Sequence, residues 1–463
     1  MEIISNTIIL ILSALSLISL IVAIHELGHF LVARYFGVKV ITFKIGFGKT
    51  LYSRFDSKGT EFAIGLIPLG GYVQMLGESG YVEGISDKNI GIGNSFSNAS
   101  AGARAMIAAA GPIANFILAI FIYTFILLIG VKHLAPIVGE VEEGSLADDM
   151  GLSIGDKIVS IDDQPISNFS DINLSLVSRI GESDEIKISF LEKEKGIIII
   201  ESFRLNNTLL DSKNPLKDFG ISPYIPAIIS SVIPDTAAFK AGLLEKDNII
   251  GINDAEILVW ADLVKSINKN KGQEVLIRVE RENQIITLLA FIDSILVQDK
   301  SSIDFGTYKG RLGITRISSI DDFPDHLTIY QQSNFFSSLY QASIKTYNYS
   351  ILILDSIINM FVGKVSMDNI GGPIQISILA GSAAKAGLIS FLSLMAFLSI
   401  NLGLINLLPI PILDGGQLLL IAIEKIKGSP ISENFLEYAF KFSLLFIGSI
   451  MIFTIFNDFM RVI

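Results

Sequence analysis

Long apolar stretches near both ends of the chain flank a more polar middle. Three of them are uncharged over at least the ~20 residues that a helix needs to cross a bilayer. They run over residues 3–24, 105–131 and 386–413, and a shorter fourth one is centred on residues 442–457. This pattern predicts a polytopic α-helical membrane protein with four transmembrane helices.

The first stretch could also be a secretory signal peptide. However, no basic segment precedes the apolar run, and no small-residue cleavage pattern follows it. Instead, the run continues directly into the sequence HELGH at residues 25–29. We therefore expect a retained transmembrane helix.

Basic residues indicate the orientation, because cytoplasmic loops carry an excess of lysine and arginine. The segment after the second stretch opens instead with acidic residues. We therefore expect the N-terminus and residues 132–385 to lie outside the cytoplasm. The basic residues on the expected cytoplasmic side are Arg34, Lys39, Lys44, Lys49, Arg54, Lys58 and Arg104, with Lys425 and Lys427 in a short loop between the last two stretches.

The outer region contains an internal repeat. IVGEVEEGSLADDMGLSIGDKIVSID (137–162) aligns at a constant offset with IISSVIPDTAAFKAGLLEKDNIIGIN (228–253), and Asp156 matches Asp247. Each copy predicts a strand, a short helix that ends at Gly-Leu, a turn and a second strand. The pattern resembles a PDZ domain, in which a peptide adds as an extra strand beside a helix. The alternative is two small α/β modules without a ligand.

The repeat divides the chain into five expected parts. A segment with helical apolar spacing, residues 333–365, is too interrupted by charge to span, so we expect amphipathic helices at the membrane surface. The parts are a membrane domain (1–135), two tandem extracytoplasmic PDZ-like α/β domains (136–205 and 222–295), a region with interfacial helices (296–376), and the third and fourth spans (377–463).

Composition supports membrane insertion and excludes some functions. Half of the residues are hydrophobic (50%), and the mean hydropathy is +0.56. The net charge of −11 argues against nucleic acid as a partner, because phosphate binding needs a basic face. The absence of cysteine excludes disulfides and cysteine-ligated metal sites.

Two of the four histidines stand in HELGH, as His25 and His29. In an HExxH helix they share one face and can hold one Zn²⁺ ion. Zinc lowers the pKa of a bound water to about 7, and Glu26 lies beside it to take a proton. The alternative is that both histidines only reach the membrane interface, with Glu26 as their ionic partner. Ionisable groups at membrane depth are costly and usually functional, which favours the metal site.

A catalytic zinc site usually has three protein ligands. His133 and His326 are poor candidates, because both lie in the outer region. Asp414 in NLLPIPILDGG (406–416) is the strongest candidate. The first and third spans both enter from outside, so Asp414 should reach the depth of HELGH.

Two prolines near Asp414, Pro409 and Pro411, cannot continue a regular helix. The chain should therefore unwind there and turn the carboxylate inward. Asn406, one turn earlier, could donate to a substrate carbonyl or orient the site. The alternative is that Asp414 and the two glycines after it form only a cytoplasmic turn.

These motifs together resemble the site-2-type intramembrane metalloproteases, in the regulator of sigma-E protease subgroup of Gram-negative bacteria. The resemblance rests on HELGH, AAAGPIANF (108–116), the tandem repeat, GGPI (371–374) and NLLPIPILDGG, and it covers essentially the whole chain. It implies that His25, His29 and Asp414 bind Zn²⁺, that Glu26 is the catalytic base, and that Asn406 helps to hold substrate. One departure is Gln417, where the family has histidine; this change bears on the hydrogen bonds around the ligand and not on the ligand set.

Alternating apolar residues between the first two spans predict strands. By themselves they indicate an ordinary cytoplasmic hairpin. The resemblance implies a membrane-associated β-loop, whose strand edge can hold an unwound substrate in an extended form. The alternating residues are Ile41, Phe43, Ile45 and Phe47, followed by Phe62, Ile64 and Leu66.

The resemblance further implies an intramembrane zinc endopeptidase of the bacterial inner membrane with its PDZ-like domains in the periplasm. Its expected substrates are single-span membrane proteins, such as anti-sigma factors and signal-peptide remnants, cut after a first extracytoplasmic cleavage. The PDZ-like domains would bind peptide C-termini or extended segments. One alternative is a non-enzymatic PDZ scaffold, which would not need both Glu26 and Asp414. Another is a metal transporter, which would need ionisable residues in several spans, and the second and fourth stretches have none.

Overall fold

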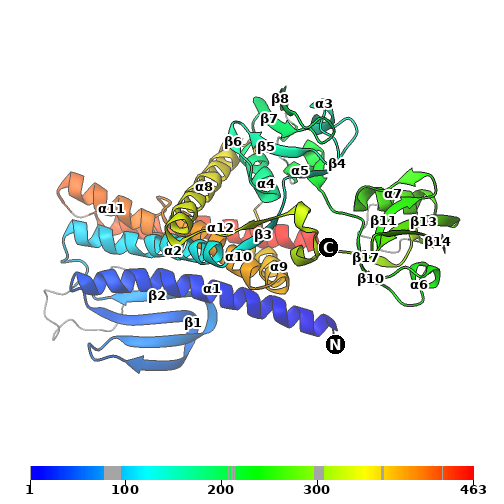
Figure 1. Ribbon diagram of the computed structural model, residues 1–463. Coiled ribbons are helices and arrows are strands. Elements are labelled where there is room, and N and C mark those ends of the chain that lie inside the picture. Colours follow the sequence, from blue (N-terminus) through cyan, green and yellow to red (C-terminus); the bar gives the residue numbers. More distant parts are fainter. Residues whose placement is uncertain are drawn as a thin grey trace. The chain divides into compact units, whose positions relative to one another are not determined.

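The computed structural model describes residues 2–77, 95–206, 208–209, 212, 214–296, 307–365, 370–429 and 431–462. The chain forms two compact units, labelled by element in Figure 1. We call the first, Met1–Gly130 with Gln332–Ile358 and Met367–Val462, the membrane unit. We call the second, Val131–Gln331 with Asn359–Ser366, the repeat unit.

Four helices of the membrane unit are long and apolar enough to cross a bilayer. Each overlaps one of the four predicted stretches, which confirms the prediction of a multi-pass membrane protein. The helices are α1 (Glu2–Tyr35), α2 (Ala101–Ile129), α10 (Leu388–Asn406) and α12 (Glu433–Val462).

The fourth candidate span is longer than its uncharged stretch. It covers Asn434–Met460 and therefore includes Glu437, Lys441 and Asp458. The expectation that this span lacks ionisable residues was wrong, because the helix extends beyond the uncharged stretch at both ends.

Asp458 has a structural partner at the start of α9 (Pro373–Ala386). Its buried carboxylate accepts hydrogen bonds from the amides of Gly372 and Ile374, both at 2.9 Å, and from Gln375 at 3.1 Å. The first amides of a helix have no partner within the helix, and a negative charge there is favourable. Asp458 of α12 therefore caps α9 and joins the two helices.

A helix, α11 (Asp414–Lys427), stands where a short loop was expected between the last two spans. The preceding span ends at Asn406, and a non-helical segment with Pro409 and Pro411 follows, as the prolines predict. Asp414 is thus the first residue of α11 and not the end of the third span.

The helix α8 (Phe335–Phe361) is continuous and is not among the candidate spans. Tyr349 of α8 stacks on Tyr123 of α2 at 6.1 Å, and the Lys345 ammonium lies 4.8 Å from the Tyr123 ring centre. Such cation–π contacts hold α8 to the membrane unit. Its position at the membrane surface stays a prediction.

The predicted hairpin consists of β1 (Val40–Phe55) and β2 (Glu61–Met75), beside α1 in Figure 1. Both strands bend, so that Phe43 pairs with Val73 and also with Phe62. Phe30 of α1 packs edge-to-face on Phe43 and Phe62 at 5.5 and 5.4 Å.

The end of α1 is tied to the turn of this hairpin. Arg34 donates hydrogen bonds to Asp56 and, at 2.9 Å, to Thr60. The Arg34 hydrogen bond keeps the pKa of Asp56 below its ordinary value, so this carboxyl is ionised at neutral pH.

The repeat unit contains two modules whose elements follow the same order up to the last strand of each four-stranded sheet, as the internal repeat predicts. Their four-stranded sheets have the orders β6-β5-β7-β8 and β12-β11-β13-β14. The first module contains β4 (Val138–Val141), α3 (Leu146–Asp149), β5 (Lys157–Ile161), β6 (Gln164–Pro165), α4 (Phe169–Ser178), β7 (Glu185–Leu191), β8 (Ile198–Arg204), α5 (Pro215–Phe219) and β9 (Ile221–Pro223). The second contains β10 (Ile229–Val232), α6 (Ala237–Ala241), β11 (Asn248–Ile252), β12 (Ala255–Glu256), α7 (Trp260–Lys269), β13 (Glu274–Arg281), β14 (Gln284–Phe291) and β17 (Ile314–Arg316).

Each module is closed by a strand that lies beyond its sequence-based boundary. In the first, β4 pairs with β9; in the second, β10 pairs with β17. These closing strands follow residues 205 and 295, where the expected domains end. Further short elements of this unit are β3 (Val131–Leu134) paired with β18 (Thr328–Gln331), β15 (Asp293–Leu296) paired with β16 (Tyr308–Arg311), and the 3₁₀ helices η3 (Ile320–Asp322) and η4 (Asp325–Leu327).

Candidate metal centre

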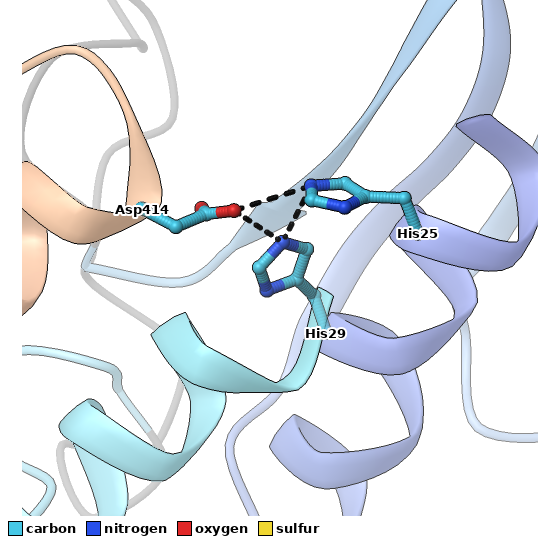
Figure 2. A group of neighbouring side chains, drawn as sticks. All are labelled: His25, His29 and Asp414. Carbon is cyan, nitrogen blue, oxygen red and sulfur yellow. Dashed lines mark hydrogen bonds and ion pairs between the residues drawn. The ribbon is translucent and has the colours of Figure 1, made fainter. Parts of the chain in front are cut away.

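Three side chains from two helices converge in the membrane unit, as Figure 2 shows. His25 and His29 lie one turn apart on α1, and Asp414 begins α11. The two Nε2 atoms are 3.2 Å apart. Asp414 Oδ2 lies 3.2 Å from His25 Nε2 and 3.4 Å from His29 Nε2. Both histidines are buried.

This geometry fits a zinc ion. A tetrahedral zinc with bonds of about 2.0–2.2 Å separates its ligand atoms by about 3.3–3.6 Å, close to the distances in this cluster. Asp414 Oδ2 is also buried without a hydrogen-bond partner among the described residues. A buried carboxylate oxygen without a hydrogen bond is costly, and a cation between the three ligand atoms would compensate it.

The hydrogen bond of His29 prepares it as a ligand. Its Nδ1 lies 2.8 Å from the carbonyl oxygen of Ile107, which can only accept. Nδ1 therefore carries the proton, and Nε2 keeps its lone pair for the metal.

Glycines allow α1 and α2 to approach closely at the histidines. A Cβ atom on Gly111 of α2 would overlap His29 Nε2 and lie 2.7 Å from His25 Cε1. A Cβ atom on Gly28 of α1 would lie 2.8 Å from the Ala114 Cβ. Small residues at such positions are typical of close helix packing in membranes.

Asp414 is positioned by the residues that follow it. A Cβ atom on Gly415 or Gly416 would overlap the carbonyl oxygens of Leu407 or Ile410, so the start of α11 packs directly on the preceding segment. Farther along α11, Glu424 forms an ion pair with Arg104 of α2 at 2.9 Å. The sequence DGG is thus the start of a helix held against α2, and not only a turn. Gln417 lies in the first turn of α11, and its backbone amide donates to the carbonyl oxygen of Leu413.

Glu26 lies between the metal cluster and the hairpin. It interacts electrostatically with His25, His29 and Asp414, and the backbone amide of Val73 donates to its carboxylate. A Cβ atom on Gly71 would lie 3.2 Å from Glu26 Cγ. The end of β2 therefore runs directly beside this carboxylate.

Asn406 also reaches the cluster. It is the last residue of α10, and its Nδ2 lies 3.3 Å from His25 Nε2. The structure thus brings all five predicted site residues into one region. His133 and His326 lie on β3 and η4 of the repeat unit, outside the cluster.

Asn115, for which the sequence indicated no role, lies at the site: its Nδ2 is 3.2 Å from His25 Nδ1. The signal was its spacing, because Asn115 follows Gly111 by one helical turn and so shares its face. AAAGPIANF thus supplies both a gap for the histidines and a polar contact to one of them.

Membrane-spanning helices and a buried His-His-Asp cluster with a glutamate beside it define a membrane-embedded metalloenzyme. The chain matches the family model "Peptidase family M50" over residues 13–450. It is 35% identical over 449 residues to "Protease RseP" of Yersinia pestis. The aligned residues make up 96% of this chain and 97% of the relative. It is 34% identical over 448 residues to "Regulator of sigma-E protease RseP" of Escherichia coli K12 and over 450 residues to a "Putative zinc metalloprotease" of Vibrio cholerae, at the same coverages. The chain belongs to peptidase family M50 and is an intramembrane zinc metalloprotease.

Proposed function

We propose that this protease cleaves single-span membrane proteins, among them anti-sigma factors and signal-peptide remnants, after a first cut outside the cytoplasm. His25, His29 and Asp414 are the zinc ligands in this proposal. The observation that carries it is the buried Oδ2 of Asp414, which has no hydrogen-bond partner among the described residues and lies at ligand distance from two histidine nitrogens. Two relatives whose printed names contain "RseP" support the substrate class.

Glu26 is the proposed general base. Bound zinc supplies a Lewis acid that polarises the substrate carbonyl and lowers the pKa of a water molecule. The Glu26 carboxylate takes a proton from the attacking water and passes it to the nitrogen of the leaving amine as the peptide C–N bond breaks. The Val73 amide holds this carboxylate toward the cluster.

Asn406 is proposed to bind the substrate carbonyl. Its Nδ2 points at His25 Nε2, so it can also donate to an oxygen that enters the same space. A donor placed where negative charge develops lowers the barrier to hydrolysis.

The edge of β2 is the proposed substrate platform. Gly71 and Val73 are two residues apart, so their backbone groups point to the same edge of the strand. The contact from the Val73 backbone to the Glu26 carboxylate supports this orientation of the edge. An unwound substrate that adds to it as a strand would bring its peptide bonds to Glu26.

The two repeated modules are proposed to be PDZ-like domains in the periplasm, with the cytoplasm on the side of the basic residues after α1. Support comes from the matching strand orders of their four-stranded sheets and from the closing strands β9 and β17. They would bind peptide C-termini or extended segments and exclude untrimmed substrates. This protein would then reside in a bacterial inner membrane.

Glu26→Gln tests the catalytic assignment. We expect cleavage of a single-span substrate to fall by at least ~10²–10⁴-fold, because the base is removed, while bound zinc stays unchanged. Glu437→Gln is the control, since Glu437 is an exposed glutamate of α12 paired with Lys441. Cleavage at the control rate by Glu26→Gln would exclude Glu26 as the base.

Deletion of residues 137–317 tests the role of the modules. This range removes both closing strands but keeps β3 and β18, which pair and hold the cut ends together. We expect the rate ratio of trimmed to untrimmed substrate to fall toward unity. An unchanged ratio would show that the modules do not select substrates by size.

A further inference from the structure

Asn115 contacts the ring nitrogen of His25 that faces away from the metal cluster. It is fully buried on α2, with Nδ2 lying 3.2 Å from His25 Nδ1. Its Oδ1 is buried without a hydrogen-bond partner among the described residues. The Ser399 hydroxyl of α10 donates to the backbone carbonyl of Asn115 at 2.9 Å. This hydrogen bond does not involve the side-chain amide of Asn115.

The two histidines are held by different kinds of group. For His29 the partner of Nδ1 is the backbone carbonyl of Ile107, which can only accept. For His25 the partner is an amide that can donate through Nδ2 or accept through Oδ1. The proton of His25 is therefore not fixed by the backbone.

The orientation of the Asn115 amide and the position of the His25 proton determine each other. Asn406 Nδ2 lies 3.3 Å from His25 Nε2, so a proton on Nε2 would set two donors against each other there. Nε2 also cannot coordinate a metal while it carries a proton. When Oδ1 of Asn115 faces the ring, it accepts from Nδ1–H and leaves the Nε2 lone pair for the metal.

We propose that Asn115 is a positioning residue that selects the metal-binding tautomer of His25 through its side-chain oxygen. This inference rests on the ligand set proposed above. It predicts that an acceptor at position 115, and not the amide as such, supports zinc binding. Loss of the partner of a ligating histidine lowers metal affinity by about 10–100-fold.

The test measures the zinc affinity of the full chain in detergent, stripped of metal and titrated with Zn²⁺ against a chromophoric chelator. Asn115→Leu keeps the size of the side chain but offers neither donor nor acceptor, and should bind zinc about 10–100-fold more weakly. Asn115→Asp offers an acceptor only and should bind at least as tightly as wild type, because a carboxylate strengthens a ligating histidine. The control Ser399→Ala should bind as wild type does.

Wild-type affinity in Asn115→Leu, or equal weakening in Asn115→Leu and Asn115→Asp, would overturn the proposal. His25→Ala separates this failure from failure of the ligand set: unchanged zinc affinity in His25→Ala would remove His25 itself from the site.

A measurement on the unaltered protein avoids any folding defect of the variants. Labelling with ¹⁵N-histidine gives signals from only four residues, and the His25 signals are identified by their loss in His25→Ala. We expect His25 to carry its proton at Nδ1 in the zinc-loaded protein. A His25 protonated at Nε2 in the zinc-loaded protein would contradict the proposal.

Discussion

The membrane unit and the repeat unit differ in what they place inside. The first module of the repeat unit fully buries large apolar side chains, including Phe190, Phe219 and Ile158. In the membrane unit at most 44% of the most apolar 18-residue window of a candidate span is buried, and large side chains such as Phe121 and Leu445 are exposed. Besides apolar side chains such as Leu17 and Ile107, its interior contains two histidines, Asn115 and closely packed glycines.

This difference follows from the solvent of each unit. In water, burial of apolar surface drives folding, so large side chains gather inside. Lipid is as apolar as leucine, so membrane helices associate through close packing at small residues and through polar contacts. We therefore expect the membrane unit to be sensitive to added volume and the repeat unit to be sensitive to lost volume.

The largest effect is expected for Gly111→Ala. The new methyl group would overlap His29 Nε2 and crowd His25, so the ligands must move. We expect zinc affinity and cleavage to fall at least ~100-fold, as for a disturbed ligand sphere. Gly102→Ala on the same helix is the matched control, because its Cβ meets nothing within 4 Å. Equal zinc affinity in both variants would contradict the close packing at the site.

The next effect, on the stability of the repeat unit and not on zinc binding, is expected for Phe190→Ala. Loss of a fully buried phenylalanine should destabilise the first module by about 3–5 kcal/mol. Thermal unfolding and protease sensitivity of the repeat unit would report this loss, while bound zinc should stay unchanged.

Ile200→Ala on β8 is the control for that change, because Ile200 is 58% exposed. Its effect should stay within about 0.5 kcal/mol. Loss of zinc in Phe190→Ala would show that the two units do not fold independently.

The sequence predicted the parts of the fold and site that have long or rigid patterns. The uncharged stretches gave the four spans, and HExxH spacing gave two facing histidines. Asp414 followed from the depth of the spans and from two prolines. The first two inferences depend on one segment alone, and the third needs only the order and direction of the spans.

The missed features depend on contacts between segments far apart in the chain. The three-residue strands β9 and β17 are too short to show alternation and exist through their pairing with β4 and β10. Two glycines hid the start of α11, because glycine disfavours helices unless close packing requires it. Asp458 and Asn115 acquire their roles only from partners on other helices.

The most direct test of the account is the zinc content of purified wild type, Asp414→Ala and Asp414→His. The account predicts about one zinc per chain in wild type, because three ligands and one open position form a catalytic site. It predicts little zinc and no cleavage in Asp414→Ala, and retained zinc in Asp414→His, since imidazole is also a zinc ligand. Full zinc occupancy and cleavage in Asp414→Ala would contradict the proposed metal centre.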